Sequence, residues 1–534
     1  MRQVEVYDTT LRDGCQAERV TFSLEDKLRI AERLDDLGIH YIEGGWPNPT
    51  NPKDVEFFQR ARKLNLKTAK ISAFGSTRRG GGKAAEDEML RALLEAETEV
   101  VAIFGKSWDL HVEQVLRVSL DENLKMIEDS VSYLVARGRT VIYDAEHFYD
   151  GFLANKDYAL KTIEVAQEAG ASCVVLCDTN GGMLPHQIHE ITSEARAVLR
   201  CPWGIHAHND SGCAAANTAA AVELGATHVQ GTINGYGERC GNANLCTVIP
   251  NMMLKQGVAA IPQEKLAQLT ALSRFVSELA NLPHDHRQPY VGASAFAHKG
   301  GAHADGVAKV TRSFEHIEPA LVGNVRRFLL SEQAGSSTIV QKLQRLKPSL
   351  NKKDPVVRRI LGRLKELEHE GYEFEAAEAS FELLARKELG EYEEMFTLQE
   401  YRIIDHKRDG GTDVEATIRV RVGDEVMHTV ATGVGPVHAL DRALRKALQP
   451  HYPEIAEIEL VDYKVRVLAE TEGTETKVRV LITTSDGQTQ WGTVGASRDV
   501  VEASWEALAD SLAYGLLKRR GRVGDAENPK TDAS

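Results

Sequence analysis

The first 233 residues alternate between short apolar runs and longer stretches of helical period. The short runs are rich in β-branched and aromatic residues, and the stretches between them repeat apolar positions every three or four residues. This alternation predicts βα units around a parallel sheet. The predicted strands cover residues 4–7, 41–43, 69–74, 100–104, 140–143, 173–177, 203–206 and 228–233.

Eight strands are the number that closes a (β/α)8 barrel, so we predict an α/β protein built on a TIM barrel. A doubly wound sheet is the competing fold. The G-x-G-x-x-G turn typical of dinucleotide-binding doubly wound sheets does not follow the first predicted strand, which favours the barrel.

One predicted helix can be followed in detail. Ser23 and Asp26 form a capping box, and Gly38 stands where the helix ends. Between them an apolar stripe runs along one face. Its members are Leu28, Ala31, Leu34 and Leu37.

The second half of the chain has a different pattern. Residues 284–395 are helical and charge-rich, whereas residues 396–520 alternate apolar and polar positions as strands do, with an amphipathic helix after each group of strands. An offset of 64 residues relates Thr429, Val430, Val437, Ala439, Ala443 and Leu444 to Thr493, Val494, Val501, Ala503, Ala507 and Leu508. We therefore predict a barrel over 1–283, helical linker subdomains over 284–395, a duplicated βββα domain of the α+β class over 396–520, and a disordered tail over 521–534.

Composition narrows the class of protein. With 534 residues, 42% hydrophobic and 27% charged, the chain can bury a large core. A formal net charge of -14 argues against a nucleic-acid partner, because no basic stripe is available to displace counterions. The N-terminal segment lacks a signal core, and no run reaches the about 18 apolar residues of a membrane span. Seven cysteines without a C-x-x-C pair fit reduced thiols, so we expect a cytoplasmic protein.

Reactive side chains follow the predicted strands at their carboxyl ends, where barrel enzymes build their active sites. Taken singly, each has a plainer interpretation, such as a helix cap, a surface charge or a turn glycine. Their common position favours a shared site. They are Arg12, Asp13, Glu43, Glu146, Asp178, Thr179, His206 and His208, with the loop GYGERCGN over residues 235–242 after the last strand.

His206-Ala-His208 indicates a divalent metal site. Residues two apart on a strand point to the same face, so both imidazoles can reach one ion while Ala207 faces away. Asp13 offers a hard oxygen ligand. Three protein ligands leave open positions, as in catalytic sites. On its own the pair also fits two ordinary strand histidines, and two histidines with one carboxylate also fit a non-haem iron oxygenase.

These motifs together carry a resemblance to a known family. Residues 10–16 read TLRDGCQ, residues 206–210 read HAHND and residues 237–243 read GERCGNA. The chain resembles the barrel metallolyases that condense acetyl-CoA with 2-oxo acids, namely the 2-isopropylmalate, homocitrate and citramalate synthases. Residues 43–53 (EGGWPNPTNPK) and 144–151 (DAEHFYDG) resemble the citramalate branch most closely.

The resemblance implies roles for the residues of the acceptor site. Asp13, His206, His208 and Asn242 would hold Mg2+, Mn2+, Zn2+ or Co2+. Arg12 would stabilise negative charge that develops on oxygen, and it would bind the acceptor together with Gln16, Glu43 and Thr179. The implied reaction joins acetyl-CoA, pyruvate and water to give (R)-citramalate and CoA.

Activation of the donor needs a general base, because the methyl group of acetyl-CoA must lose a proton. The family uses a histidine backed by a glutamate, and the matches here are His303, in HKGGAHADG over residues 298–306, and Glu146. In the family this segment closes the active site of the partner chain, so the resemblance implies a homodimer. The plainer interpretation is that His298 and His303 lie on a flexible surface loop.

The chain departs from the family pattern at two positions. Cys15 replaces the glutamate found in isopropylmalate synthases, and Phe314 stands where many relatives have tyrosine. The first departure fits a different acceptor. The second removes a hydroxyl that helps to polarise or deprotonate.

The C-terminal repeat resembles the regulatory domain of these synthases, where an end-product amino acid binds. For a citramalate route to 2-oxobutyrate that effector would be isoleucine. The turn of Gly433 and Gly435 before a predicted helix offers a site for a carboxylate. A dimerisation module without a ligand is the alternative.

Other functions stay open at this point. A synthase with a larger 2-oxo acid acceptor shares every motif, because one methylene changes discrimination by only about 1–3 kcal/mol. A lyase of the hydroxymethylglutaryl-CoA type shares the metal motif. A non-catalytic amino-acid sensor would need only the C-terminal domain.

Overall fold

The computed structural model describes residues 2–48, 50–330, 335–344, 346–408, 411–468 and 476–521. Its contacts divide the chain into two compact units. The first comprises Met1–Phe296 with Ile317–Val325, and the second comprises Ala297–His316 with Arg326–Ser534. Residues 522–534 of the predicted tail lie outside the described residues.

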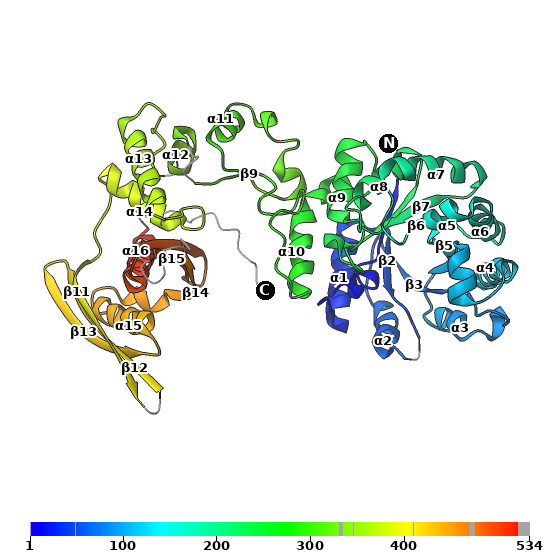
Figure 1. The fold of residues 1–534 in the computed structure, drawn as a ribbon, viewed down its shortest axis with the longest axis horizontal. Helices are drawn as coiled ribbons and strands as arrows, with labels where there is room; N and C mark the ends of the chain where they lie inside the picture. The colour runs from blue at the N-terminus through cyan, green and yellow to red at the C-terminus, as the bar shows by residue number, and fades with distance from the viewer. Residues whose placement is uncertain are drawn as a thin grey trace. The chain divides into compact units, whose positions relative to one another are not determined.

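The first unit is a closed barrel of parallel strands, in which each strand pairs with the next and β8 pairs with β1 (Figure 1). The predicted barrel is confirmed, and the doubly wound alternative is excluded because the sheet has no edge. The strands are β1 (Glu5–Asp8), β2 (Tyr41–Gly45), β3 (Lys70–Ser76), β4 (Val100–Lys106), β5 (Thr140–Glu146), β6 (Cys173–Asp178), β7 (Trp203–Ala207) and β8 (His228–Gly231).

Helices follow the strands and cover the outside of the barrel (Figure 1). They are α1 (Leu24–Leu37), α2 (Pro52–Ala61), α3 (Glu88–Glu95), α4 (Leu120–Val135), α5 (Phe148–Ala154), α6 (Lys156–Glu168), α7 (Pro185–Val198), α8 (Ala214–Glu223), α9 (Leu245–Pro250) and α10 (Leu269–Leu279). The predicted capping box of α1 is present, and Gly38 ends that helix with φ +96°. The last predicted strand is too long: β8 ends at Gly231, and the chain turns at Ile233–Gly235.

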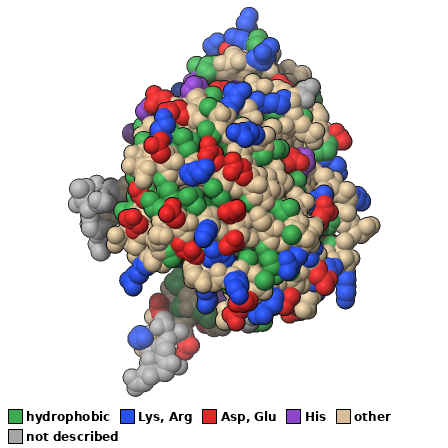
Figure 2. Space-filling view, turned by 90° about the vertical axis from the view of Figure 1, so that its right-hand side faces the viewer, with side chains coloured by type: hydrophobic (Ala, Val, Ile, Leu, Met, Phe, Trp, Pro, Cys, Tyr) green, Lys and Arg blue, Asp and Glu red, His purple; other side chains and the backbone are tan. Residues whose placement is uncertain are grey.

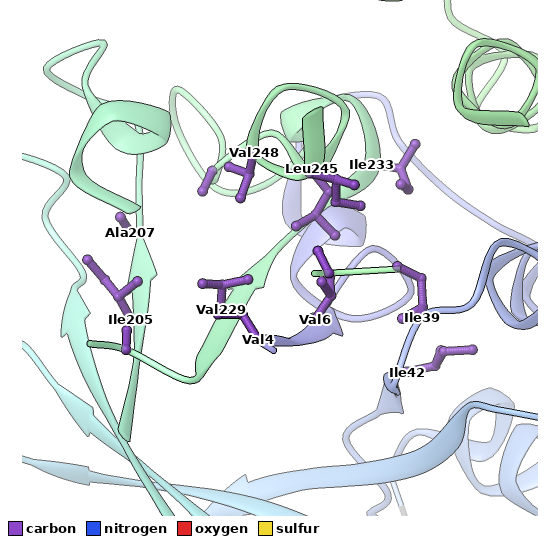
Figure 3. Close-up of a cluster of buried hydrophobic side chains, with 14 of the residues drawn as sticks. Val4, Val6, Ile39, Ile42, Ile205, Ala207, Val229, Ile233, Leu245 and Val248 are labelled. Carbon is purple, nitrogen blue, oxygen red and sulfur yellow. The ribbon is translucent and has the colours of Figure 1, made fainter. Parts of the chain in front are cut away.

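Alternation along the strands separates two layers of core. On β5, Val141 and Tyr143 pack between strands and helices, whereas Ile142 faces the barrel interior. Ile205 and Val229 belong to the outer layer with Leu245 of α9, as Figure 3 shows. Because side chains alternate, the residues next to them on β7 and β8 face inward. The interior is therefore packed with side chains at the middle of the strands and polar at their carboxyl ends.

The first unit extends past the predicted limit of residue 283. Tyr290, Val291 and Phe296 are buried in the barrel core, so residues 284–296 pack with the barrel rather than with the linker helices.

The second unit begins with the linker elements β9 (Ala297–His298), α11 (Gly301–Lys309), β10 (Arg327–Phe328), α12 (Ser336–Leu343), α13 (Pro355–His369) and α14 (Glu378–Leu389). Two three-stranded antiparallel sheets follow, each with one helix. They are β11 (Thr397–Arg408), β12 (Gly411–Val422) and β13 (Glu425–Gly433) with α15 (Pro436–Leu448), and β14 (Glu459–Val467), β15 (Val478–Ser485) and β16 (Gln490–Ser497) with α16 (Val500–Arg519).

The two βββα units repeat a specific hydrogen bond. Thr429 Oγ1 donates to Ala443 O at 2.7 Å, and Thr493 Oγ1 donates to Ala507 O at 2.7 Å. Each bond ties the last strand of a sheet to its helix, and donor and acceptor both shift by the predicted 64 residues. The predicted duplication is confirmed at atomic detail.

No helix within the described ranges is both long enough and apolar enough to cross a membrane. Acidic and basic side chains are interspersed on the face that Figure 2 shows.

Replacing either repeated threonine by valine should lower the thermal transition of the second unit. Thr493 is fully buried and Thr429 is half-buried, so Thr493→Val should cost more, about 0.5–1.5 kcal/mol. Differential scanning calorimetry measures the shift. Thr432→Val, at an exposed position of β13, is the control, and equal melting of all three variants would contradict the role of the repeated bond.

Candidate functional site

The carboxyl ends of the barrel strands surround a cavity of about 200 Å³. Predicted site residues from β1, β5, β6 and β7 all reach it. Its lining comprises Arg12, Asp13, Gln16, Trp46, Phe74, Phe104, Asp144, Glu146, Cys177, Thr179, His206, His208, Glu238 and Arg239.

The two histidines of the H-x-H motif face one point. Ala207 packs in the outer core, so His206 and His208 turn to the opposite face, and their Nε2 atoms lie 3.3 Å apart. Asp13 Oδ2 is 3.4 Å from His206 Nε2. One ligand atom from each of these three buried residues lies within 4.8 Å of the others, a group that could hold a metal ion.

Asn242 joins this group from the loop after β8. Its Nδ2 atom lies 3.2 Å from Asp13 Oδ2 and 3.1 Å from His206 Nε2. A backbone bridge between His208 and Asn242 fixes the loop, and a Cβ atom at Gly237 would collide with the Asn242 amide. A half-turn of that amide would present its oxygen to a cation in place of the nitrogen.

Some buried polar atoms of this group lack hydrogen-bond partners, as is expected where a cation binds. Asp13 Oδ1, His208 Nδ1 and Asn242 Oδ1 are buried and have no hydrogen-bond partner within the described residues. Metal–ligand bonds of about 2.1 Å place neighbouring ligand atoms about 3.0–3.4 Å apart, which is the range of separations found here. The donor set of one carboxylate, two imidazoles and one amide oxygen therefore fits a hard or borderline divalent ion.

Charges at the site favour the ligand forms of Asp13 and His208, whereas the Asp13 carboxylate outweighs burial and raises the pKa of His206. Burial would raise the pKa of Asp13, but Arg12 and His206 outweigh burial and hold that pKa well below its usual range. Burial and the neighbouring His206 lower the pKa of His208 to about 4. At neutral pH Asp13 is thus a carboxylate and His208 a neutral imidazole, as metal binding requires.

Arg12 is held rigidly at the rim of the group. Its Nε atom donates to Glu43 Oε1 at 2.5 Å, and its guanidinium lies 3.7 Å from the centre of the Phe74 ring. Glu43 is fully buried, and its other oxygen accepts from the Tyr7 hydroxyl at 2.9 Å. Glu43, predicted to bind substrate, thus contacts Arg12 and Tyr7 and does not line the cavity.

Thr179 and Glu146 also line the cavity. Thr179 Oγ1 accepts from the backbone N–H of His147 at 2.9 Å, which leaves its hydroxyl hydrogen to donate. Glu146 ends β5 and forms an ion pair with Lys106, which ends the neighbouring β4. Gln16, in the 3-10 turn Asp13–Gln16, also lines the cavity.

Three aromatic residues and Asp144 line the cavity but were not singled out from the sequence. Trp46 makes edge contacts with Phe74 and Phe104, at 5.7 and 5.6 Å between ring centres, and Phe74 stacks on Phe104. Asp144 lies two residues before Glu146 on β5, and burial raises its pKa to about 7. The period-two spacing from Glu146 on β5 is the sequence signal that could have identified Asp144 as inward-facing.

The remaining predicted residues belong to the second unit. His303 is on α11, and its ring stacks on Phe314 with 4.3 Å between ring centres. A Cβ atom at Gly306 would lie 2.5 Å from the Phe314 ring, so glycine makes room for this stack. His303 and Glu146 belong to different units, so their predicted meeting stays a prediction.

Gly433 and Gly435 lie where β13 meets α15. A Cβ atom at Gly433 would be 2.5 Å from Ala439 N, so strand and helix touch directly there. Gly435 precedes α15 without a side-chain cap, whereas Asp499 caps α16 in the second repeat by accepting from Val501 N at 2.8 Å.

Comparisons with known proteins agree with this geometry. The HMGL-like family model matches residues 3–276, the "Homocitrate synthase post-HMGL domain-like" model matches residues 290–371, and the "LeuA allosteric (dimerisation) domain" model matches residues 375–516. The (R)-citramalate synthase of Aquifex aeolicus is 54% identical over 97% of this chain and 98% of its own length. The chain belongs to the HMGL-like family, among the (R)-citramalate synthases.

Two further relatives also align along nearly the whole chain. The (R)-citramalate synthase of Geobacter sulfurreducens is 53% identical over 97% of this chain and 98% of its own length. A probable 2-isopropylmalate synthase of Methanopyrus kandleri is 33% identical over 97% of this chain and 99% of its own length.

Removal of one imidazole should abolish tight metal binding. His208→Ala should weaken Mn2+ or Zn2+ binding by more than the about 10–100-fold typical of residues behind the ligands. Isothermal titration of the metal-free protein measures this. His189→Ala, on the exposed face of α7, should bind like wild type, and an unchanged His208→Ala titration would exclude the site.

Proposed function

We propose that this protein is an (R)-citramalate synthase, an acyltransferase that condenses acetyl-CoA with pyruvate and water to give (R)-citramalate and CoA. The observation that supports this best is the convergence of Arg12, Thr179, Glu146 and the Asp13–His206–His208 group on one cavity. The chain carrying that cavity also matches (R)-citramalate synthases over nearly its full length.

Pyruvate would bind beside the metal group. Asp13, His206, His208 and Asn242 would hold a divalent ion, which when bound would act as a Lewis acid on the keto group. Thr179 donates its hydroxyl hydrogen to the pyruvate carboxylate. Gln16 lines the same cavity and adds a side-chain amide to this contact.

Arg12 would stabilise the negative charge that develops on the keto oxygen. Its orientation is fixed by the Glu43 carboxylate and the Phe74 ring, so little reorganisation accompanies the reaction. We assign Glu43 to the positioning of Arg12, because both of its oxygens are already engaged.

Deprotonation of acetyl-CoA would fall to His303 and Glu146. His303 takes the methyl proton, the methyl carbon forms a bond to the keto carbon, and the keto oxygen takes up the electron pair and later a proton. Water then cleaves the thioester and releases CoA. Glu146 orients the histidine, and the ion pair with Lys106 holds Glu146 at the end of β5.

The shape of the cavity favours a small acceptor. Trp46, Phe74 and Phe104 pack against one another and fill one side of it. Arg12 lies on the Phe74 ring, beside these aromatic side chains. An acceptor that had to displace one of them would meet an overpacking cost of about 1–3 kcal/mol.

The second unit would supply both the dimer and the control of activity. We propose a homodimer in which His303 of one chain serves the barrel of the other, and isoleucine as the feedback inhibitor in a branched-chain amino-acid route. The uncapped start of α15 at Gly433 and Gly435 supports an effector carboxylate there. All seven cysteines lie in the described ranges and are free, which supports a cytoplasmic location.

Release of CoA tests the proposed activity directly. The full-length protein is assayed with acetyl-CoA, a divalent metal and pyruvate, 2-oxoisovalerate or 2-oxoglutarate, each with and without isoleucine. Metal-dependent release with pyruvate alone, inhibited by isoleucine, is expected. Release with a larger acid would reassign the acceptor, and no release with any acid would exclude a synthase.

Lysine should not replace the arginine of the acceptor site. Arg12→Lys keeps the charge but loses the fork that contacts Glu43 and the flat surface on Phe74. The kcat should fall by about 10²–10³, the effect of losing one donor to a developing oxyanion. Arg62→Lys, in an exposed pair with Glu97, is the control, and a near-wild-type kcat for Arg12→Lys would refute the role.

A further inference from the structure

Gln230 lies directly behind the metal group without lining the cavity. It is on β8, 1% exposed, and pairs in register with His206 on β7. Figure 3 shows its neighbour Val229 in the outer core beside Ile205, which agrees with the inward position of Gln230. A polar side chain buried this deeply needs hydrogen-bond partners.

The partners of Gln230 determine which way its amide points. Its Nε2 atom donates to Asp144 Oδ1 at 3.0 Å and lies 3.4 Å from His228 Nε2, while its Oε1 atom lies 2.8 Å from His206 Nδ1. An NH2 group carries two hydrogens: one is donated to Asp144 Oδ1, and the other faces His228 Nε2, which accepts in the tautomer protonated on Nδ1. The amide oxygen is thereby left to face His206.

We propose that Gln230 is a positioning residue that selects the metal-binding tautomer of His206. An amide oxygen only accepts, so the hydrogen of neutral His206 is held on Nδ1. The Nε2 lone pair then faces Asp13, His208 and Asn242. This inference rests on the proposed metal site, but not on the identity of the substrates.

The second imidazole of the group lacks this kind of support. His208 Nδ1 is buried without a hydrogen-bond partner within the described residues. Orientation of the imidazole pair therefore depends on the chain Asp144–Gln230–His206, which runs across β5, β8 and β7. Asp144 adds a carboxylate at the end of that chain, and such a partner raises the basicity of a ligating histidine.

Two variants separate positioning from simple packing. Gln230→Met keeps the length of the side chain but removes both the acceptor and the donor. Gln230→Glu keeps an acceptor oxygen for His206, and a proton shared between its other oxygen and Asp144 Oδ1 replaces the donated N–H. Asn217→Leu is the control, because Asn217 is an equally buried amide on α8 that donates to Met183 O at 2.8 Å, away from the metal group.

The experiment measures binding of Mn2+ and Co2+ to the metal-free full-length protein by calorimetry, and the visible spectrum of the Co2+ form. Gln230→Met should bind about 10–100-fold more weakly, with an altered Co2+ spectrum. Gln230→Glu should restore the wild-type affinity and spectrum. Asn217→Leu should lower the melting temperature but leave the metal affinity and the Co2+ spectrum unchanged.

Wild-type affinity and spectrum in Gln230→Met would overturn the proposal. Equal weakening in Gln230→Met and Gln230→Glu would do so as well, because a retained acceptor would then be irrelevant. Absence of metal binding by the wild-type protein would refute the metal site and this inference together. Metal binding without CoA release would refute only the proposed reaction.

Discussion

Closure of the barrel between β1 and β8 is the contact on which the site depends. Asp13 follows the first strand of the sheet and Asn242 follows the last, and their side chains meet only because β8 pairs with β1. Local bonds make this closure rigid. Thr10 Oγ1 accepts from Ile233 N at 2.9 Å and donates to Asp8 Oδ2 at 2.9 Å, so the turn carrying Arg12 and Asp13 is fixed to the last strand.

The carboxyl end of the barrel departs from the rule that buried polar atoms are paired. Asp13 Oδ1, Asn242 Oδ1 and His208 Nδ1 lack partners within the described residues, and unpaired buried groups cost about 1–3 kcal/mol each. Other buried polar groups in the same layer have hydrogen-bond partners. Glu43, for example, accepts from both Arg12 and Tyr7. Such local violations in an otherwise consistent fold are expected at functional sites. A cation would satisfy the Asp13 carboxylate and, after a half-turn of its amide, the Asn242 oxygen.

The two copies of the βββα repeat in the second unit lie in different surroundings. The Thr429 and Thr493 bonds show that both copies fold by the same interactions. The second copy contacts the linker helix α14 through Ser380, which accepts from Val494 N and donates to Asp510. A duplicated module can therefore hold an effector in one copy and contact the linker through the other.

The periodicity of hydrophobic residues, together with the residues that end helices and strands, was enough to predict the barrel, the alternation of strands and helices, and the duplicated domain. Ser23 and Gly38 mark the two ends of a helix through local capping. The H-x-H spacing places two imidazoles on one face of a strand. The helix limits and the imidazole pair therefore follow from short-range geometry. Only the tertiary structure decided which strand-end residues face the cavity and which stand behind it. Glu43 contacts Arg12, Gln230 contacts His206, and Trp46, Phe74 and Phe104 line the cavity. These roles depend on pairs far apart in sequence, which no local pattern encodes and which only closure of the sheet brings together.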